Sequence, residues 1–215
     1  MPYKVHPSGK LVSLFKEKPW QGNNPLNSTF VFVGLDANYA ANIEKKLPEI
    51  FEYLEDGVAF WRQHKVHHPF RLPYYKGKGR KYHDKFAEIG FAPEHAETVS
   101  FLELLDVPTI GSQLGPSDLS INHLFFLADV FENGAAEYIF MYPGVVALLR
   151  RTRLFKWLPA KTTERGDALT VLREKEGQII YQMYHFSCRY SRQVAVLDKH
   201  IEQVRNILER MERSK

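Results

Sequence analysis

Short apolar runs and helical repeats alternate along this chain of 215 residues. Three runs rich in β-branched and aromatic residues, over 29–35, 98–105 and 137–142, predict strands buried on both faces. Two further runs, over 168–173 and 178–184, predict strands joined by a turn.

Between these runs, apolar residues recur at helical spacing. They predict helices over 41–55, over 117–131 with Ser117 as a cap, after Pro143 and over 192–213. Pro48 must lie in a first turn or interrupt the first of these helices.

Strands that alternate with helices predict an α/β fold, here a three-layer α/β/α domain with a central, mostly parallel four-stranded sheet. We expect one domain over residues 1–215, with a long irregular insertion at about 57–85, where Gly, Pro, His and Lys break the pattern. Ligands of such folds bind outside the carboxyl ends of the strands. Three polar segments, 36–39, 103–109 and 185–189, follow predicted strands, so we expect them to line one pocket.

Composition narrows the class of protein. Hydrophobic residues make up 44% of the chain and charged residues 25%, which suits a domain with a full core. No apolar run is long enough to span a membrane, the first residues lack a signal-peptide pattern, and a single cysteine, Cys188, excludes an internal disulfide. We therefore expect a cytoplasmic monomer without a membrane partner. The net charge of +4 slightly favours a polyanionic partner.

Three motifs follow these strands in a fixed order. They are Gly-Leu-Asp-Ala-Asn at 34–38, Leu-Leu-Asp-Val-Pro-Thr at 104–109 and His-Phe-Ser at 185–187. In this order they resemble the uracil-DNA glycosylase superfamily, with the mismatch-specific uracil/thymine DNA glycosylases as the most similar branch. The resemblance spans roughly residues 28–39 and 82–212. It implies a monofunctional DNA glycosylase that acts on DNA without a cofactor and leaves an abasic site.

Hydrolysis of an N-glycosidic bond requires a carboxylate near the sugar, a hydrogen-bond donor to the leaving base and a pocket for the flipped nucleotide. The resemblance assigns the first role to Asp36 and the second to His185, which would donate to the pyrimidine O2. Asp36 could instead cap the following helix, and His185 could bond only the loop backbone. Ser187 and Arg189 would contact DNA phosphates, although Phe186 replaces the family's usual proline.

The base itself would be bound by Asn38, Glu103 and an aromatic ring, for which Phe60 or Trp61 is the expectation. Glu103 lies near the place where uracil-specific members have an Asn that reads the base edge. An ionised carboxylate accepts hydrogen bonds without donating them, so it favours the exocyclic amine of cytosine over uracil O4. We therefore expect a damaged or modified pyrimidine, such as a 5-substituted cytosine surrounded by the insertion. The alternative is a Glu103 that faces solvent.

A basic run lies within the insertion. Lys76, Lys78, Arg80 and Lys81 are interleaved with glycines, which suits phosphate contact and equally suits a solvated loop. The His-x-x-His-His sequence at 64–68 lacks a matching carboxylate or thiolate set, so we expect no metal site. Competing functions are a catalytically inactive nucleic-acid or nucleotide-binding module and a hydrolase of free nucleosides. The sequence leaves open whether the role is repair of the host genome or defence against foreign modified DNA.

Overall fold

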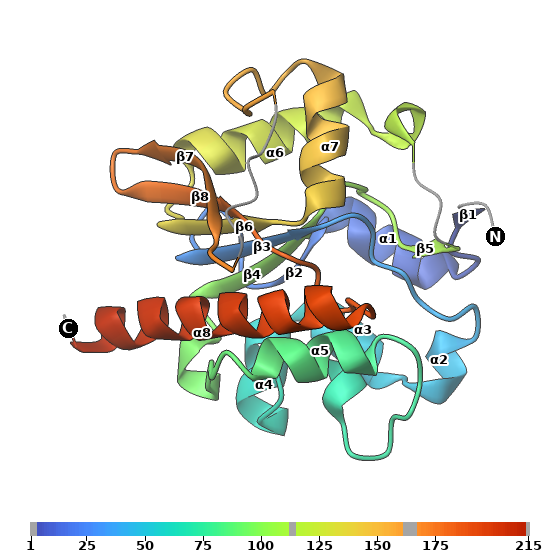
Figure 1. Ribbon diagram of the computed structural model, residues 1–215. Helices are drawn as coiled ribbons and strands as arrows, with labels where there is room; N and C mark the ends of the chain where they lie inside the picture. Colours follow the sequence, from blue (N-terminus) through green and yellow to red (C-terminus); the bar gives the residue numbers. More distant parts are fainter. Residues whose placement is uncertain (1–3, 112–114, 161–166, 214–215) are drawn as a thin grey trace.

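The computed structural model describes residues 4–111, 115–160 and 167–213 (Figure 1). Its main sheet has six strands in the order β2-β4-β3-β6-β8-β7. These are β2 (Trp20–Gly22), β4 (Val99–Glu103), β3 (Phe30–Gly34), β6 (Tyr138–Met141), β8 (Gln178–Gln182) and β7 (Thr170–Lys175). The middle four strands pair in parallel, whereas β2 and β7 pair antiparallel at the two edges.

The expected mostly parallel sheet is therefore confirmed, and the expected count of four strands is wrong. Every residue of β3 is buried, as predicted for a strand with helices on both faces. The edge strand β2 was missed because three residues are too few to show an alternating pattern. The edge strand β7 joins β8 through a turn at Glu176 and Gly177, both with positive φ, so this predicted pair is a hairpin.

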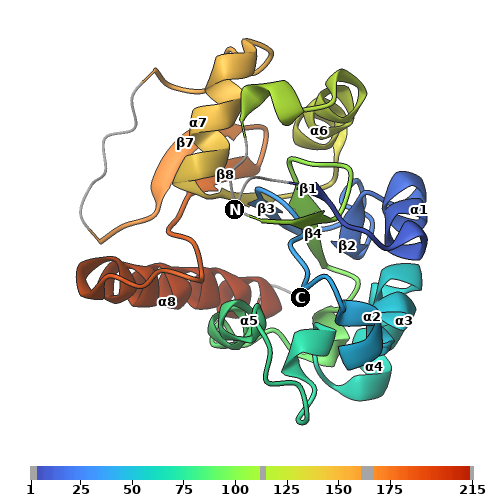
Figure 2. The ribbon, with the colours of Figure 1, turned by 90° about the vertical axis from the view of Figure 1, so that its right-hand side faces the viewer.

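Helices cover both faces of the sheet (Figures 1 and 2). One layer contains α6 (Ile121–Asn133) and α7 (Pro143–Thr152), and the other contains α3 (Glu49–Glu55), α4 (Gly57–His64), α5 (Arg80–Ala87) and α8 (Ser191–Arg213). The long helix α8 buries Leu197, Ile201, Val204 and Leu208, which recur every three or four residues and so form one apolar stripe. The three-layer arrangement agrees with the sequence prediction.

The segment over 57–85 is mostly helical, so the prediction of an irregular insertion is wrong. It contains α4, a 3₁₀ turn η1 (Pro69–Arg71) and the start of α5. Asp56 begins α4 by accepting hydrogen bonds from the backbone N–H groups of Val58 and Ala59. Because α4 has only eight residues, its apolar repeat was too short to stand out among the surrounding glycines and prolines.

Two helix boundaries also differ from the prediction. The expected helix over 41–55 is interrupted at Pro48 and forms α2 (Ile43–Lys46) and α3. The helix α6 begins later than expected, because Ser120 rather than Ser117 caps it, and residues Pro116–Asp118 form the 3₁₀ turn η3.

The N-terminal segment adds elements that the sequence did not reveal. The two-residue strand β1 (Lys4–Val5) pairs antiparallel with β5 (Thr109–Ile110), and α1 (Gly9–Glu17) begins at the cap Ser8. This pairing holds the loop after β4 beside the loop after β3, where Asn38 and Thr109 form an isolated bridge. Among the described residues, no helix is long and apolar enough to cross a membrane.

Candidate active site

A pocket of about 340 Å3 opens at the carboxyl ends of β3, β4 and β8, as the fold predicts. Five of the residues singled out from the sequence line it: Asp36, Asn38, Glu103, His185 and Ser187. They come from three segments far apart in the chain, which meet because parallel strands end at the same edge of a sheet. Five side chains in one pocket make this the candidate active site.

Asp36 follows β3 and is held by neighbours in the pocket. Its Oδ2 accepts a hydrogen bond from the Asn38 amide at 3.1 Å and another from the Thr109 hydroxyl. The Asn38 amide also bonds Thr109 Oγ1 at 3.1 Å. Asp36 is therefore bound by side chains of two loops and does not cap α2, whose cap position is Asn42. Donors on the charged form of a carboxylate stabilise it.

Glu103 ends β4 and lies against β3, directly opposite Gly34 in the register. A Cβ on Gly34 would lie 2.1 Å from Glu103 Oε2, so only glycine leaves room for this carboxyl group. The same Oε2 is buried and has no hydrogen-bond partner among the described residues. Burial, with a smaller contribution from Asp36, raises the pKa of Glu103 well above its usual range. The buried Oε2 contradicts the alternative of a solvent-facing Glu103, and the raised pKa favours the protonated form over the expected carboxylate.

His185 follows β8 and is a neutral hydrogen-bond donor. Its Nδ1 accepts the backbone N–H of Ser187 at 3.1 Å, which assigns the remaining ring proton to Nε2. Burial lowers the pKa of His185 to about 4. The ring packs edge-on against Tyr142, with centroids 4.4 Å apart, and lies 5.1 Å from Tyr82. A neutral imidazole in this orientation can stabilise negative charge that develops on a ligand oxygen.

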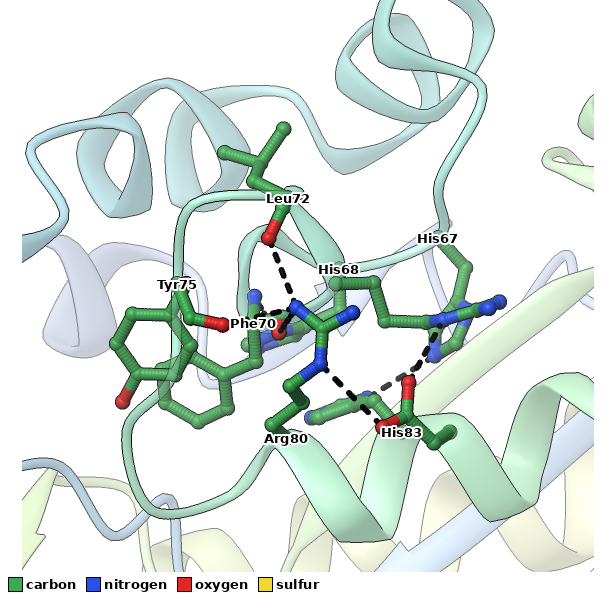
Figure 3. Close-up of polar contacts among 9 residues, drawn as sticks. His67, His68, Phe70, Leu72, Tyr75, Arg80 and His83 are labelled. Carbon is green, nitrogen blue, oxygen red and sulfur yellow. Dashed lines mark hydrogen bonds and ion pairs between the residues drawn. The ribbon is translucent and has the colours of Figure 1, made fainter.

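The wall opposite the strand ends comes from the segment over 68–83 (Figure 3). His68, Phe70, Tyr82 and His83 line the pocket there. The rings of His68 and His83 stack with centroids 3.7 Å apart, and His67 bonds His83 between Nε2 and Nδ1 at 3.0 Å. Burial lowers the pKa of all three histidines, that of His83 to about 3, so the neutral form of these three rings is favoured.

Arg80 stabilises the segment over 68–83 through hydrogen bonds and an ion pair (Figure 3). Its Nη1 donates to the carbonyl oxygens of Leu72 and Tyr75, both at 2.8 Å, and its Nε pairs with Asp84 at 3.4 Å. The preceding Gly79 has a φ of +90°, and a Cβ there would lie 2.2 Å from the Phe70 ring. The Arg80 guanidinium group therefore closes the loop over 70–80, and its expected contact with DNA phosphates stays a prediction.

Other expected ligand contacts also lie elsewhere. Phe60 is fully buried against Tyr53, and Trp61 is buried against His67 in the core. Neither ring reaches the pocket, so the expected stacking on the base is wrong for both. They occupy adjacent positions of α4 and point into the protein because that helix is amphipathic.

The remaining basic positions lie outside the pocket. Lys76, Lys78 and Lys81 are exposed, and none of them lines the pocket. Arg189 is also exposed and borders a neighbouring hollow that includes His185 and Ser187. These side chains remain free to contact a ligand that extends beyond the pocket.

Several residues in or beside the pocket were not singled out from the sequence. Tyr82 and His83 line it, and the Tyr82 and Tyr142 hydroxyl groups bond each other at 2.7 Å. Thr109 lies beside it and donates a hydrogen bond from its hydroxyl group to Asp36. Thr109 could have been found from the sequence, because it is the last residue of the second motif, which follows Glu103. Tyr82 and His83 could not, because only the packing of α5 brings them to the strand ends.

Among the described residues, no group of three or more His, Cys, Asp and Glu side chains is arranged to hold a metal ion. In the histidine cluster the ring nitrogens of His67 and His83 bond each other.

A scan against models of known protein families and a search of curated proteins both returned no match for this chain. Any functional assignment therefore depends on the chemistry of the pocket.

Proposed function

We propose that this protein is a monofunctional DNA glycosylase, which hydrolyses the N-glycosidic bond of a flipped pyrimidine and leaves an abasic site. The observation that carries this proposal is the meeting of Asp36 and His185 in one pocket. A carboxylate and a neutral imidazole donor are the two groups that the reaction requires, one for the sugar and one for the base.

Each group has a separate task in this mechanism. Asp36, held through Oδ2 by Thr109 and Asn38, stabilises positive charge on the sugar and accepts a proton from the attacking water. His185 donates from Nε2 to the pyrimidine O2 as negative charge develops on the leaving base. Because His185 is neutral and its Nδ1 accepts a hydrogen bond from Ser187, its one ring proton is on Nε2 and can be donated to the base.

The pocket also supports a flipped base as the ligand. Its volume of about 340 Å3 accommodates a pyrimidine, and Phe70, Tyr82 and Phe101 supply aromatic surface in the lining. Of these, Phe70 and Tyr82 belong to the wall over 68–83, which replaces Phe60 and Trp61 as the source of a stacking ring. Ser187, Arg189, Lys76, Lys78 and Lys81 are the proposed phosphate contacts around the pocket mouth.

The finer proposal is a cytosine-type base that carries a substituent at its 5-position, with a role in repair or in defence against foreign modified DNA. The wall over 68–83 supports it by extending the pocket with His68 and His83, whose neutral rings can hydrogen-bond a polar substituent. A catalytically inactive binding module would not need the arrangement of donors that holds Asp36.

The proposal is tested by a panel of oligonucleotides that carry uracil, thymine, cytosine or a 5-substituted cytosine at one position, in single and double strands. Alkali after incubation cleaves the strand at any abasic site. We expect cleavage by the wild type and none by Asp36→Ala prepared in parallel. Free pyrimidine nucleosides form a second panel, and release of base from nucleosides alone would favour a nucleoside hydrolase. Binding without cleavage of any member would favour the inactive module.

A further inference from the structure

Glu103 brings an unsatisfied polar atom into the candidate active site. Its Oε2 is buried, lies against Gly34 and has no hydrogen-bond partner among the described residues. Buried polar atoms in native proteins are nearly always bonded, so an exception at a binding site indicates a bond that a ligand completes. The carboxyl group also lines the pocket together with Asp36 and His185.

The groups around Glu103 provide no positive charge to balance an ionised carboxylate. Among the described residues that line the pocket there is neither lysine nor arginine. Asp36 faces Glu103 from the loop after β3, and its charge opposes a second negative charge. The other titratable groups that face it are phenols and imidazoles: Tyr39, Tyr53, Tyr82, Tyr142, His68, His83, His123 and His185.

These neighbours are themselves held uncharged. Burial raises the pKa of the four tyrosines and lowers that of the four histidines. The imidazole of His123 does not reach Oε2 either, because its Nε2 lies 2.8 Å from the backbone carbonyl oxygen of Glu103. These surroundings favour Glu103 as a carboxylic acid, which has one O–H donor and one C=O acceptor.

We propose that the protonated Glu103 pairs with the N3–N4 edge of a cytosine-type base and transfers its proton to N3 as the glycosidic bond breaks. The inference depends on the proposed glycosylase function and extends it to a substrate class. The Glu103 O–H donates to N3, an acceptor in cytosine, and the carbonyl oxygen accepts a hydrogen bond from the N4 amine.

The step balances in atoms and charge. The N1–C1′ bond breaks and its electron pair stays with the base, while Glu103 supplies a proton to N3, so the base leaves as neutral cytosine. A water oxygen bonds C1′, and the proton of that water passes to Asp36. Glu103 is then a carboxylate and Asp36 an acid, and exchange of one proton with solvent restores both.

Cytosine gains more from this acid than uracil does. Uracil already carries a proton on N3 and leaves as a relatively stable anion, with His185 positioned for its O2. Cytosine without protonation is a poorer leaving group, so an acid at N3 lowers its barrier more. General acid catalysis contributes about 10²- to 10⁴-fold in such reactions.

The test compares wild type with Glu103→Gln on otherwise identical oligonucleotides that carry cytosine, 5-hydroxymethylcytosine or uracil. Glutamine keeps one donor and one acceptor at the same length, but it has no proton to transfer. We expect a loss of about 10²-fold or more on both cytosine-type substrates and less than about tenfold on uracil. Glu94→Gln, an exposed carboxyl group outside the pocket, is the matched control and should change neither rate.

A pH profile gives a second measurement that does not depend on any variant. The active form of Glu103 is protonated and its pKa is raised, so the wild-type rate on cytosine-type substrates should fall as pH rises through that pKa. Equal losses on cytosine and uracil, or a wild-type cytosine rate that does not fall with rising pH, would overturn the role of Glu103 alone. If the wild type produces no abasic site from any base, both this inference and the proposed function are wrong.

Discussion

Two carboxyl groups at neighbouring strand ends of this protein have opposite surroundings. Asp36 follows β3 and receives hydrogen bonds on one oxygen from Asn38 and Thr109. Glu103 ends the adjacent strand β4, and its Oε2 has no partner among the described residues. The two carboxyl groups therefore differ in their hydrogen-bond donors and in the burial of their oxygens, although they lie in the same pocket.

The difference arises from the segments that face each group. The loop over 104–110 reaches Asp36 because β5 pairs with β1 and brings the Thr109 hydroxyl to it. Glu103 instead lies between Gly34 and the wall over 68–83, where the nearby histidines and tyrosines are uncharged. Asp36 and Glu103 are both carboxylic acids by residue type, so their different surroundings come from the number of hydrogen-bond donors that the fold brings to each one.

The largest effect should follow removal of the Asp36 charge. Asp36→Ala is expected to lower the single-turnover rate by about 10³- to 10⁴-fold, because its charge acts mainly in the transition state. Binding of the oligonucleotide and the melting temperature should change little. The control Asp106→Asn removes a carboxylate from the adjacent loop but outside the pocket. An alanine variant that cleaves at the wild-type rate would remove Asp36 from the mechanism.

The second-largest loss of rate should follow removal of the His185 imidazole. His185→Ala is expected to lower the rate by about 10²- to 10³-fold, the usual cost of one donor to a developing oxyanion. The matched control is His64→Ala, which removes an imidazole that pairs with Glu52 outside the pocket. A large drop in melting temperature with normal activity per folded molecule would instead indicate that His185 only supports the loop after β8.

A smaller loss of rate should result from removing a hydrogen bond to Asp36 while the Asp36 side chain itself is kept. Thr109→Val removes the hydroxyl donor from a fully buried position with almost no change in volume. We expect kcat to fall about 10- to 100-fold with KM nearly unchanged, since a hydrogen bond to a charged group contributes roughly 1.5–3 kcal/mol. Thr109→Ser should restore most of the rate, because it restores the hydroxyl group. If serine and valine act alike, Thr109 supports the fold and does not position Asp36.

The smallest effect concerns the basic run beside the wall. Neutralising the exposed Lys76, Lys78 and Lys81 should weaken DNA binding and flatten its dependence on salt, because each phosphate contact releases counterions. Arg80→Gln is the contrasting variant: its guanidinium group bonds loop carbonyls, so it should lower the melting temperature instead. An unchanged salt slope in the triple variant would identify the run as ordinary solvated surface.

The strand ends of this protein could be located from sequence, because buried parallel strands have a distinctive local pattern. Runs such as 29–35 and 98–105 are apolar throughout and end at polar residues, so the positions of Asp36, Glu103 and His185 followed from local chemistry. The short strands β1, β2 and β5 could not be located in this way, because they have only two or three residues each.

The amino-acid sequence by itself therefore determined the α/β class, the parallel centre of the sheet and the meeting of three polar segments at one edge. Only the tertiary structure decided what surrounds each of them. The burial of Phe60 and Trp61, the bonds of Arg80 to loop carbonyl oxygens and the raised pKa of Glu103 all depend on contacts that exist only in the folded chain. The physical reason is that burial and donor count are set by contacts between residues distant in the chain, which no local pattern encodes.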